Sequence, residues 1–279
     1  MKTIKMMLAF VAAMLVAVSC GSKKQEAPKQ KVLVIYYSQT ATTKAVAQEL
    51  AAKLGADVEE IVPVKPYDGD FPATIARWQQ EREQGVLPEL KPIKADLAQY
   101  DVIFLGYPVW GGTYAPPVAA FLETADLSGK KIVPFCSFGS GGLDTSVRAL
   151  KEKLPGAEIQ PGYGVRKARL NAMPAEVDNF LKAGGFIEGE YTNLPDFSEQ
   201  HAVSEEESAI FDTAVGGYPM IKAKATTIAQ RAIPGGTEYF FTAANLPREG
   251  AAPDEPAGEI KVYVTVLEGQ APEFTQVLR

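Results

Sequence analysis

The sequence predicts an α/β fold in which a doubly wound, five-stranded parallel sheet is followed by a small α+β domain. Up to about residue 185, short runs of β-branched and aromatic residues alternate with amphipathic helical stretches. Such alternation favours parallel strands joined by right-handed helical crossovers, with helices on both faces of the sheet. Beyond Gly185, one helical stretch precedes several strand-like runs, which is typical of a helix packed on an antiparallel sheet.

The predicted elements follow from these patterns. The five strands of the first domain are Val32–Tyr37, Val58–Val62, Val102–Gly106, Lys131–Cys136 and Glu158–Val165. Its five helices are Thr43–Leu54, Phe71–Gln84, Pro117–Glu123, Leu143–Leu154 and Pro174–Ala183. In the second domain we expect a helix over Ser208–Val215 capped by Ser204, and strands over Met220–Arg231, Thr237–Ala244, Glu259–Leu267 and Phe274–Leu278. A tight turn at Pro234–Gly236 and a polar loop at Arg248–Gly258 separate these strands.

Charge is distributed unevenly between the two parts. Residues 20–185 hold 20 Lys and Arg against 19 Asp and Glu, whereas residues 186–279 hold 6 against 15. The shift supports a boundary near Gly185, with a linker over 186–203 and the small domain over 204–279. A neutral domain joined to an acidic one argues against nucleic acid as a partner.

The N-terminus predicts export and membrane attachment. Lys2 and Lys5 precede an uncharged apolar run over residues 6–18, which is shorter than the roughly 20 residues that span a bilayer. We therefore expect a signal peptide over residues 1–19. The run ends in small residues followed by Cys20, which resembles a bacterial lipobox and implies lipidation of Cys20. Residues 20–31 would then form a polar tether; the alternative is an ordinary signal peptide followed by a chance cysteine.

A cluster of hydroxyls follows the first predicted strand. Ser38, Thr40, Thr42 and Thr43 lie where a helix is expected to begin, and backbone N–H groups at such a helix start are free to bind an anion. The segment lacks the glycines of a Walker A loop and of the GxGxxG motif. We predict a neutral phosphate cradle; the alternative is simple capping of the helix by Ser or Thr.

Two further loops should meet this cradle, because the carboxyl ends of parallel strands share one edge of the sheet. The loop Tyr107–Pro117, after the third strand, holds two glycines beside Trp110 and Tyr114, and so offers flat apolar faces and close backbone approach. The alternative places Trp110 in the core. The loop Ser137–Gly142, after the fourth strand, is also glycine-rich.

These three loops resemble those of the flavodoxin-like family. The pattern Ser38-x-Thr40-Ala41-x-Thr43 is similar to that family's fingerprint, with Ala41 in place of glycine, and the resemblance covers residues 32–185. It implies a flavodoxin-like domain that binds FMN, with the phosphate near the hydroxyls and the ring against Trp110 and the loop after the fourth strand. The implied cofactor-binding residues are Ser38, Thr40, Ala41, Thr42, Thr43, Pro108, Val109, Trp110, Gly111, Gly112, Ser137, Phe138, Gly139 and Gly141.

No residue presents itself as a catalytic acid, base or metal ligand. Cys136 ends a buried strand, where a thiol usually serves as inert packing. His201 lies in the expected acidic linker without a second histidine to join it. We predict neither a catalytic residue nor a metal site.

The second domain resembles cystatin-like domains, through AIPGGTEYFF (232–241) and EIKVYVTVLEG (259–269). The inhibitory turn of cystatins usually carries a glutamine ahead of two valines and a glycine, whereas this chain reads Ala232-Ile233-Pro234-Gly235-Gly236. We therefore expect a docking or oligomerisation module.

Together these features predict an FMN-binding electron-transfer protein or FMN-dependent oxidoreductase, lipid-anchored in the bacterial cell envelope and facing the periplasm. Its partner would be a redox protein or a small electron acceptor such as a quinone. One alternative is an envelope binding module that has lost the cofactor. Another is a cystatin-like protease inhibitor.

Overall fold

The computed structural model describes residues 30–67, 70–218, 221–246 and 258–278. The predicted signal peptide, Cys20 and most of the tether lie outside the described residues, as does nearly all of the polar loop 248–258. Within the described residues, no helix is long and apolar enough to cross a membrane.

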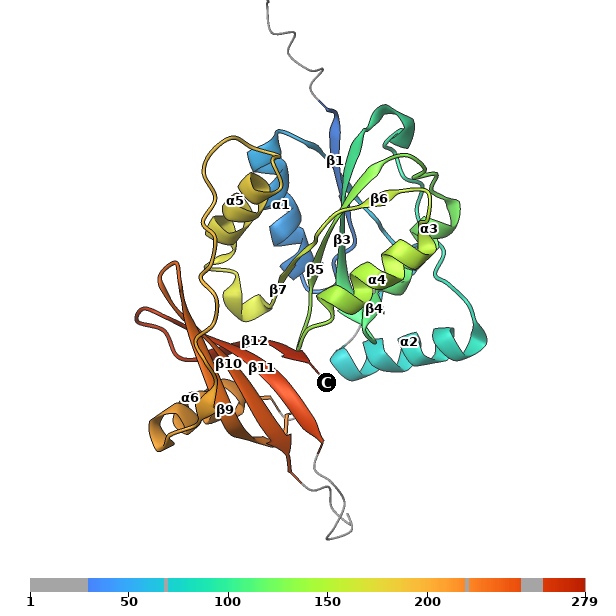
Figure 1. Cartoon of the computed structure of the whole chain (residues 1–279). Helices are drawn as coiled ribbons and strands as arrows, with labels where there is room; N and C mark the ends of the chain where they lie inside the picture. Colours follow the sequence, from blue (N-terminus) through green and yellow to red (C-terminus); the bar gives the residue numbers. More distant parts are fainter. Residues whose placement is uncertain (1–29, 68–69, 219–220, 247–257, 279) are drawn as a thin grey trace, which may run out of the picture.

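The first domain is built on a parallel sheet in the order β2-β1-β3-β5-β6, which confirms the predicted doubly wound fold (Figure 1). All neighbours along this path are parallel. The strands of the domain are β1 Val32–Tyr36, β2 Asp57–Glu60, β3 Val102–Trp110, β4 Thr113–Tyr114, β5 Lys131–Ser137, β6 Glu158–Ile159 and β7 Tyr163–Val165.

Helices cover both faces of this sheet (Figure 1). The described helices are α1 Thr42–Leu54, α2 Phe71–Gln84, α3 Pro116–Thr124, α4 Leu143–Lys153 and α5 Met173–Ala183. Alternate residues of β1 supply the two cores: Leu33 and Ile35 pack with α3 and α4, and Val34 and Tyr36 pack with α1 and α5. Because successive side chains of a strand point to opposite faces of the sheet, β1 contributes to the hydrophobic core on each side.

Two predictions about the strands were wrong in detail. The segment Tyr107–Trp110, expected to be loop, continues β3 and turns back into β4, with Val109 paired to Tyr114. Gly111 and Gly112 have φ of 58° and 84°, and two consecutive positive φ angles are what a type I′ hairpin turn requires. The expected fifth strand is divided into β6 and β7, both paired to β5, because Pro161 between them has no N–H to donate to the sheet.

The second domain is an antiparallel sheet in the order β12-β11-β10-β9-β8 with one helix packed on it, which confirms the predicted α+β class. Its elements are β8 His201–Ala202, α6 Glu205–Val215, β9 Ala223–Ile233, β10 Gly236–Asn245, β11 Glu259–Leu267 and β12 Glu273–Leu278. A capping box joins Ser204 and Glu207, so α6 begins three residues earlier than predicted. β8 lies in the segment expected to be linker, where it pairs with β9.

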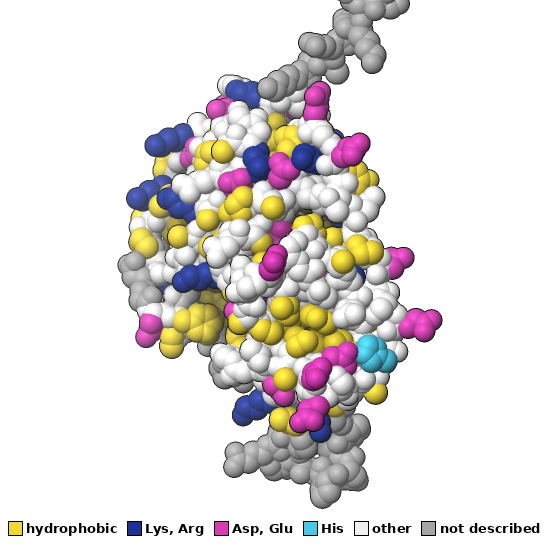
Figure 2. Space-filling model, turned by 90° about the vertical axis from the view of Figure 1, so that its left-hand side faces the viewer, with side chains coloured by type: hydrophobic (Ala, Val, Ile, Leu, Met, Phe, Trp, Pro, Cys, Tyr) yellow, Lys and Arg dark blue, Asp and Glu magenta, His cyan; other side chains and the backbone are white. Residues whose placement is uncertain are grey.

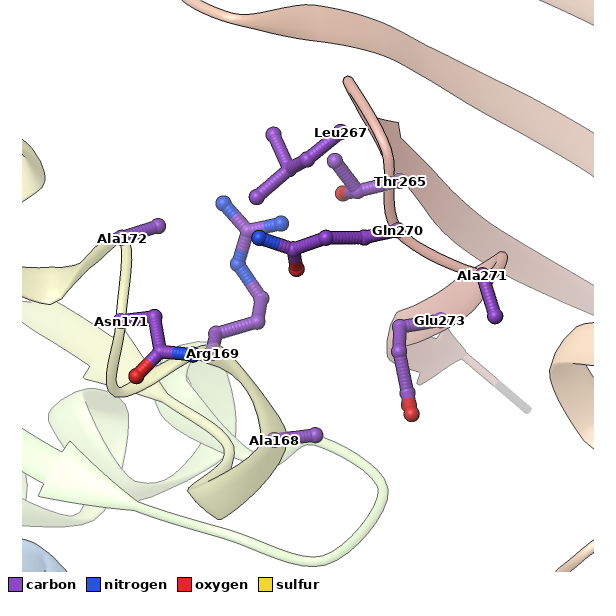
Figure 3. Close-up of a pocket in the computed structure, with 9 residues that line it drawn as sticks. All are labelled: Ala168, Arg169, Asn171, Ala172, Thr265, Leu267, Gln270, Ala271 and Glu273. Carbon is purple, nitrogen blue, oxygen red and sulfur yellow. The ribbon is translucent and has the colours of Figure 1, made fainter.

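The two domains touch along β12, which lies beside the carboxyl end of β5 (Figure 1). Figure 3 shows the Arg169 side chain reaching from the first domain toward Leu267 and Gln270 of the second. The cavity between them measures about 10 Å³, room for about one water molecule. Thr265, whose buried hydroxyl has no partner among the described residues, also lines it. This face of the interface is therefore closely packed.

Candidate functional site

A cavity of about 550 Å³ opens beyond the carboxyl ends of β1, β3 and β5. This is where parallel α/β sheets bind ligands, and the volume lies within the usual range for small-molecule sites. The predicted site residues that line the cavity are Thr40, Thr42, Pro108, Val109, Trp110, Gly111, Gly112, Ser137, Phe138, Gly139 and Gly141. All three predicted loops therefore contribute to one cavity.

The hydroxyls after β1 divide into two groups. Thr40 and Thr42 line the cavity. Ser38 and Thr43 do not: the Ser38 hydroxyl accepts the Lys44 N–H at 3.2 Å, and the buried Thr43 hydroxyl shares a 2.8 Å hydrogen bond with the Ser137 hydroxyl. Thr43 thus ties the first turn of α1 to the end of β5, and Thr40 and Thr42 are the threonine hydroxyls positioned to meet a ligand.

Ala41 is the N-cap of α1 and has φ of 63°, in the left-handed region. In the described parts of the chain it is the one non-glycine residue with positive φ. The N-cap residue makes no side-chain hydrogen bond to the helix, and the hydroxyl that accepts an N–H of its first turn is that of Ser38, so the capping alternative explains Thr40 and Thr42 poorly. A left-handed residue next to a helical turn directs successive N–H groups to one side and forms an anion-binding nest. Strain of this kind, of the order of 1–3 kcal/mol, often accompanies function.

We expect Ala41→Gly to stabilise the ligand-free protein by up to about 1 kcal/mol, because glycine adopts positive φ without a Cβ clash. Ala52→Gly, at an exposed position within α1, should instead destabilise it by roughly 0.5–1 kcal/mol. Urea unfolding of both variants beside the parent measures the two shifts. Equal destabilisation by both substitutions would show that Ala41 stores no strain.

The β3–β4 hairpin places Trp110 at the cavity, where other aromatic rings hold the indole in place. Its ring packs edge-on against Tyr37 and Tyr67, at centroid distances of 6.3 and 5.1 Å. Arg77 lies 3.8 Å above the Tyr67 ring, and the Tyr67 hydroxyl donates to Glu81. Trp110 is half-buried, so it both belongs to an aromatic cluster and lines the cavity. This arrangement provides a rigid apolar platform.

The tyrosines behind Trp110 act as neutral hydrogen-bond donors. Burial raises the pKa of Tyr67, and the hydrogen bond to Glu81 raises it further. Burial likewise raises the pKa of Tyr37, whose hydroxyl donates to Gln39. The Gln39 amide in turn donates to the Tyr67 carbonyl at 2.6 Å. The platform is therefore held by hydrogen bonds as well as by packing.

Several lining residues were missing from the sequence prediction: Gln39, Asp70, Phe71, Thr74, Ile75, Ser140, Lys167 and Tyr218. Gln39 and Ser140 lie inside predicted loops and could have been included. Lys167 follows the last strand of the parallel sheet, which is also a standard position for site residues. The start of α2 and Tyr218 of the second domain carry no sequence signal that would place them here. Phe71, 78% exposed, lies at the mouth.

Cys136 and His201 lie away from the cavity lining. Cys136 is fully buried in β5, and burial raises the pKa of its thiol well above the ordinary value, which agrees with the predicted packing role. The His201 ring lies 2.9 Å from Glu207, on the surface of the second domain where Asp and Glu side chains gather (Figure 2). Among the residues that the structure describes, no group of His, Cys, Asp and Glu could hold a metal ion.

Comparison with known proteins gives matches to the first domain. Residues 31–179 match a family model described as Flavodoxin. A protein assigned as a flavoprotein from Bacteroides eggerthii is 32% identical, with a TM-score of 0.47 over 53% of this chain and 96% of that one. One from Bacteroides uniformis is 27% identical, with a TM-score of 0.48 over 53% and 98%. A flavoprotein in complex with FMN from Lactobacillus acidophilus is 22% identical, with a TM-score of 0.44 over 52% and 98%. No curated protein matches the chain.

Proposed function

This chain belongs to the flavodoxin family, and on that premise we propose that its first domain binds FMN in the cavity and serves as an electron-transfer protein or oxidoreductase of the bacterial cell envelope. The observation that carries the proposal is the meeting of a hydroxyl-rich helix start, an aromatic hairpin and a glycine-rich loop at one cavity. When bound, FMN supplies one- and two-electron chemistry.

The helix start fits a phosphate. Thr40 and Thr42 offer hydroxyl donors beside the N-terminus of α1, where the helix dipole favours an anion. Among the described lining residues, the charged ones are Asp70 and Lys167, and the Asp70 carboxylate accepts the Ala73 N–H at 2.9 Å as the cap of α2. A dianionic phosphate therefore meets neutral donors and no opposing carboxylate from its own loop.

The hairpin and the glycine-rich loop fit a flat heteroaromatic ring. Trp110 offers an apolar face, and Gly111 and Gly112 bring the backbone to the cavity without side chains in the way. Gly139 and Gly141 do the same from the loop after β5. Backbone N–H groups at these positions would bind the polar edge of the ring and exclude water from it.

The proposed role needs no catalytic acid or base from the protein. An electron carrier binds its cofactor, adjusts its potential and exposes an edge to a partner. Phe71, exposed at the mouth, gives that edge an apolar border where a redox protein or a quinone-like acceptor would approach.

The test is the visible spectrum of purified residues 21–279, recorded with and without added FMN and after gel filtration. We expect flavin absorbance to stay with the protein. Free FMN eluting separately at micromolar protein would contradict the proposal and favour a binding module that has lost the cofactor. Inhibition of papain by the same preparation would favour a cystatin-like role for the second domain.

Attachment to the membrane through Cys20 is the second part of the proposal. Cys20→Ala should move the protein from the detergent phase to the soluble periplasmic fraction or block its processing, because a diacylated cysteine is the only anchor proposed. Cys136→Ala is the matched control, since that thiol is buried in β5. Phase partitioning after cell fractionation measures both. A Cys20→Ala protein that still partitions into detergent would contradict lipidation at this residue.

A further inference from the structure

The second domain contacts the glycine-rich loop that borders the cavity. The Val277 N–H of β12 donates to the Ser140 carbonyl at 2.7 Å, across the domain boundary. A Cβ atom on Gly141, which has φ of 129°, would lie 3.1 Å from the Val277 carbonyl oxygen. The backbone of the loop therefore lies directly against β12, with little room for a side chain at Gly141.

Arg166 joins the loop to the second domain by several bonds. Its Nε donates to the Gly139 carbonyl at 2.7 Å. Its Nη1 donates to the Phe274 carbonyl and lies 3.2 Å from a Glu273 carboxylate oxygen, both on β12. The guanidinium also lies 3.6 Å above the Phe274 ring. A side chain only 14% exposed thus bonds to both sides of the domain boundary.

Tyr218 reaches the cavity from the second domain. It follows α6, its N–H donates to the Val215 carbonyl at 2.8 Å, and its ring packs 5.1 Å from the Phe274 ring. A Cβ atom on Gly139 would lie 3.3 Å from the Tyr218 hydroxyl oxygen, so the phenol occupies space that the glycine leaves open. Tyr218 lines the same cavity as Trp110, Gly139 and Gly141.

We propose that the second domain completes the cofactor site: Tyr218 forms an aromatic wall against the ring of FMN, and β12, through Arg166 and Val277, holds the glycine-rich loop in its binding conformation. This inference rests on the proposed function of the first domain and assigns to the second a part in cofactor binding.

Ordering the glycine-rich loop for ligand binding costs conformational entropy. Five of the six residues 137–142 are glycine or serine, without a branched side chain to restrict the backbone, and fixing each residue costs about 1–2 kcal/mol in entropy. The bonds from Arg166 and Val277 hold the loop before the ligand arrives, so less of this cost falls on binding. The phenol of Tyr218 lies at the loop after β5, whereas the phosphate donors lie after β1, so its contact should be with the ring.

The test compares Tyr218→Leu and Tyr218→Phe with the parent by titration with FMN and with riboflavin. Loss of the aromatic face should weaken both ligands by the same factor, roughly two- to tenfold, and leave the ratio of their dissociation constants unchanged. Tyr218→Phe keeps the ring and should bind almost as the parent does. Tyr191→Leu removes an exposed tyrosine that lies away from the cavity lining and is the matched control.

Arg166→Met tests separately whether the bonds of Arg166 hold the glycine-rich loop, and its result does not depend on the folding of Tyr218→Leu. We expect faster hydrogen exchange of the amides 138–142 in the ligand-free protein, and weaker binding of both ligands. Arg148→Met, at an exposed position of α4, is its control. Failure of the parent to bind either ligand would contradict the proposed function itself. Parent-like affinity in Tyr218→Leu, or parent-like exchange and affinity in Arg166→Met, would overturn this inference alone.

Discussion

Thr40→Val and Thr42→Val should each weaken FMN binding by roughly ten- to a hundredfold while leaving riboflavin binding nearly unchanged. Both hydroxyls line the cavity at the start of α1. A hydrogen bond to a charged phosphate is worth about 1.5–3 kcal/mol, and valine removes the hydroxyl while keeping the branched shape. Riboflavin has the same ring without the phosphate. Fluorescence titration with the two ligands therefore isolates the phosphate contribution.

Thr43→Val is the internal control for these variants. Its hydroxyl is buried in a 2.8 Å hydrogen bond with Ser137 and lies outside the cavity lining. Its loss should lower the free energy of unfolding by about 1 kcal/mol or more, because the Ser137 hydroxyl loses its partner. The ratio of FMN to riboflavin affinity should stay close to that of the parent. If the ratio of FMN to riboflavin affinity also stays at the parent value in Thr40→Val and Thr42→Val, these two hydroxyls have a structural role and do not bind the phosphate.

Much of the first domain could be predicted because its strands are buried on both faces. A continuous run of β-branched and aromatic residues such as Val32–Tyr36 indicates a buried strand directly. The helix α2 begins and ends at the predicted residues, Phe71 and Gln84. The β3–β4 hairpin could not be predicted in the same way, because its residues 109–114 lie within a Pro- and Gly-rich stretch typical of a loop, and only the pairing of Val109 with Tyr114 defines the strands. Pairing between two such short strands produces no hydrophobic periodicity in the sequence of either strand.

The same limit applies to the site. The topological rule for parallel sheets brings together segments that follow strands, and it led to Thr40, Trp110 and Gly139. It makes no statement about a helix whose start lines the cavity, so Phe71 and Thr74 were missed. It also makes no statement about a second domain, and Tyr218 reaches the cavity only because β12 docks on the loop after β5. Contacts of that kind depend on tertiary docking, which the local pattern does not encode.

Trp110→Ala should weaken FMN and riboflavin alike, by tenfold or more. The variant loses a stacking interaction of about 0.5–1.5 kcal/mol and also the burial of the indole face, worth roughly a further 1–2 kcal/mol. Because both ligands carry the ring, their affinity ratio should not change, in contrast to the threonine variants. Isothermal titration with each ligand, corrected for the folded fraction, measures the effect.

Stability must be measured beside affinity, because Trp110 also packs against Tyr37 and Tyr67. The second tryptophan of the chain provides the matched control. Trp78 of α2 packs against the hairpin, where a Cβ atom on Gly111 would meet its ring at 2.6 Å, and it is not among the residues that line the cavity. Trp78→Ala should therefore lower stability with a smaller loss of affinity. If Trp110→Ala behaves like Trp78→Ala, with lower stability and near-parent affinity, Trp110 belongs to the core and the ring must lie against another wall.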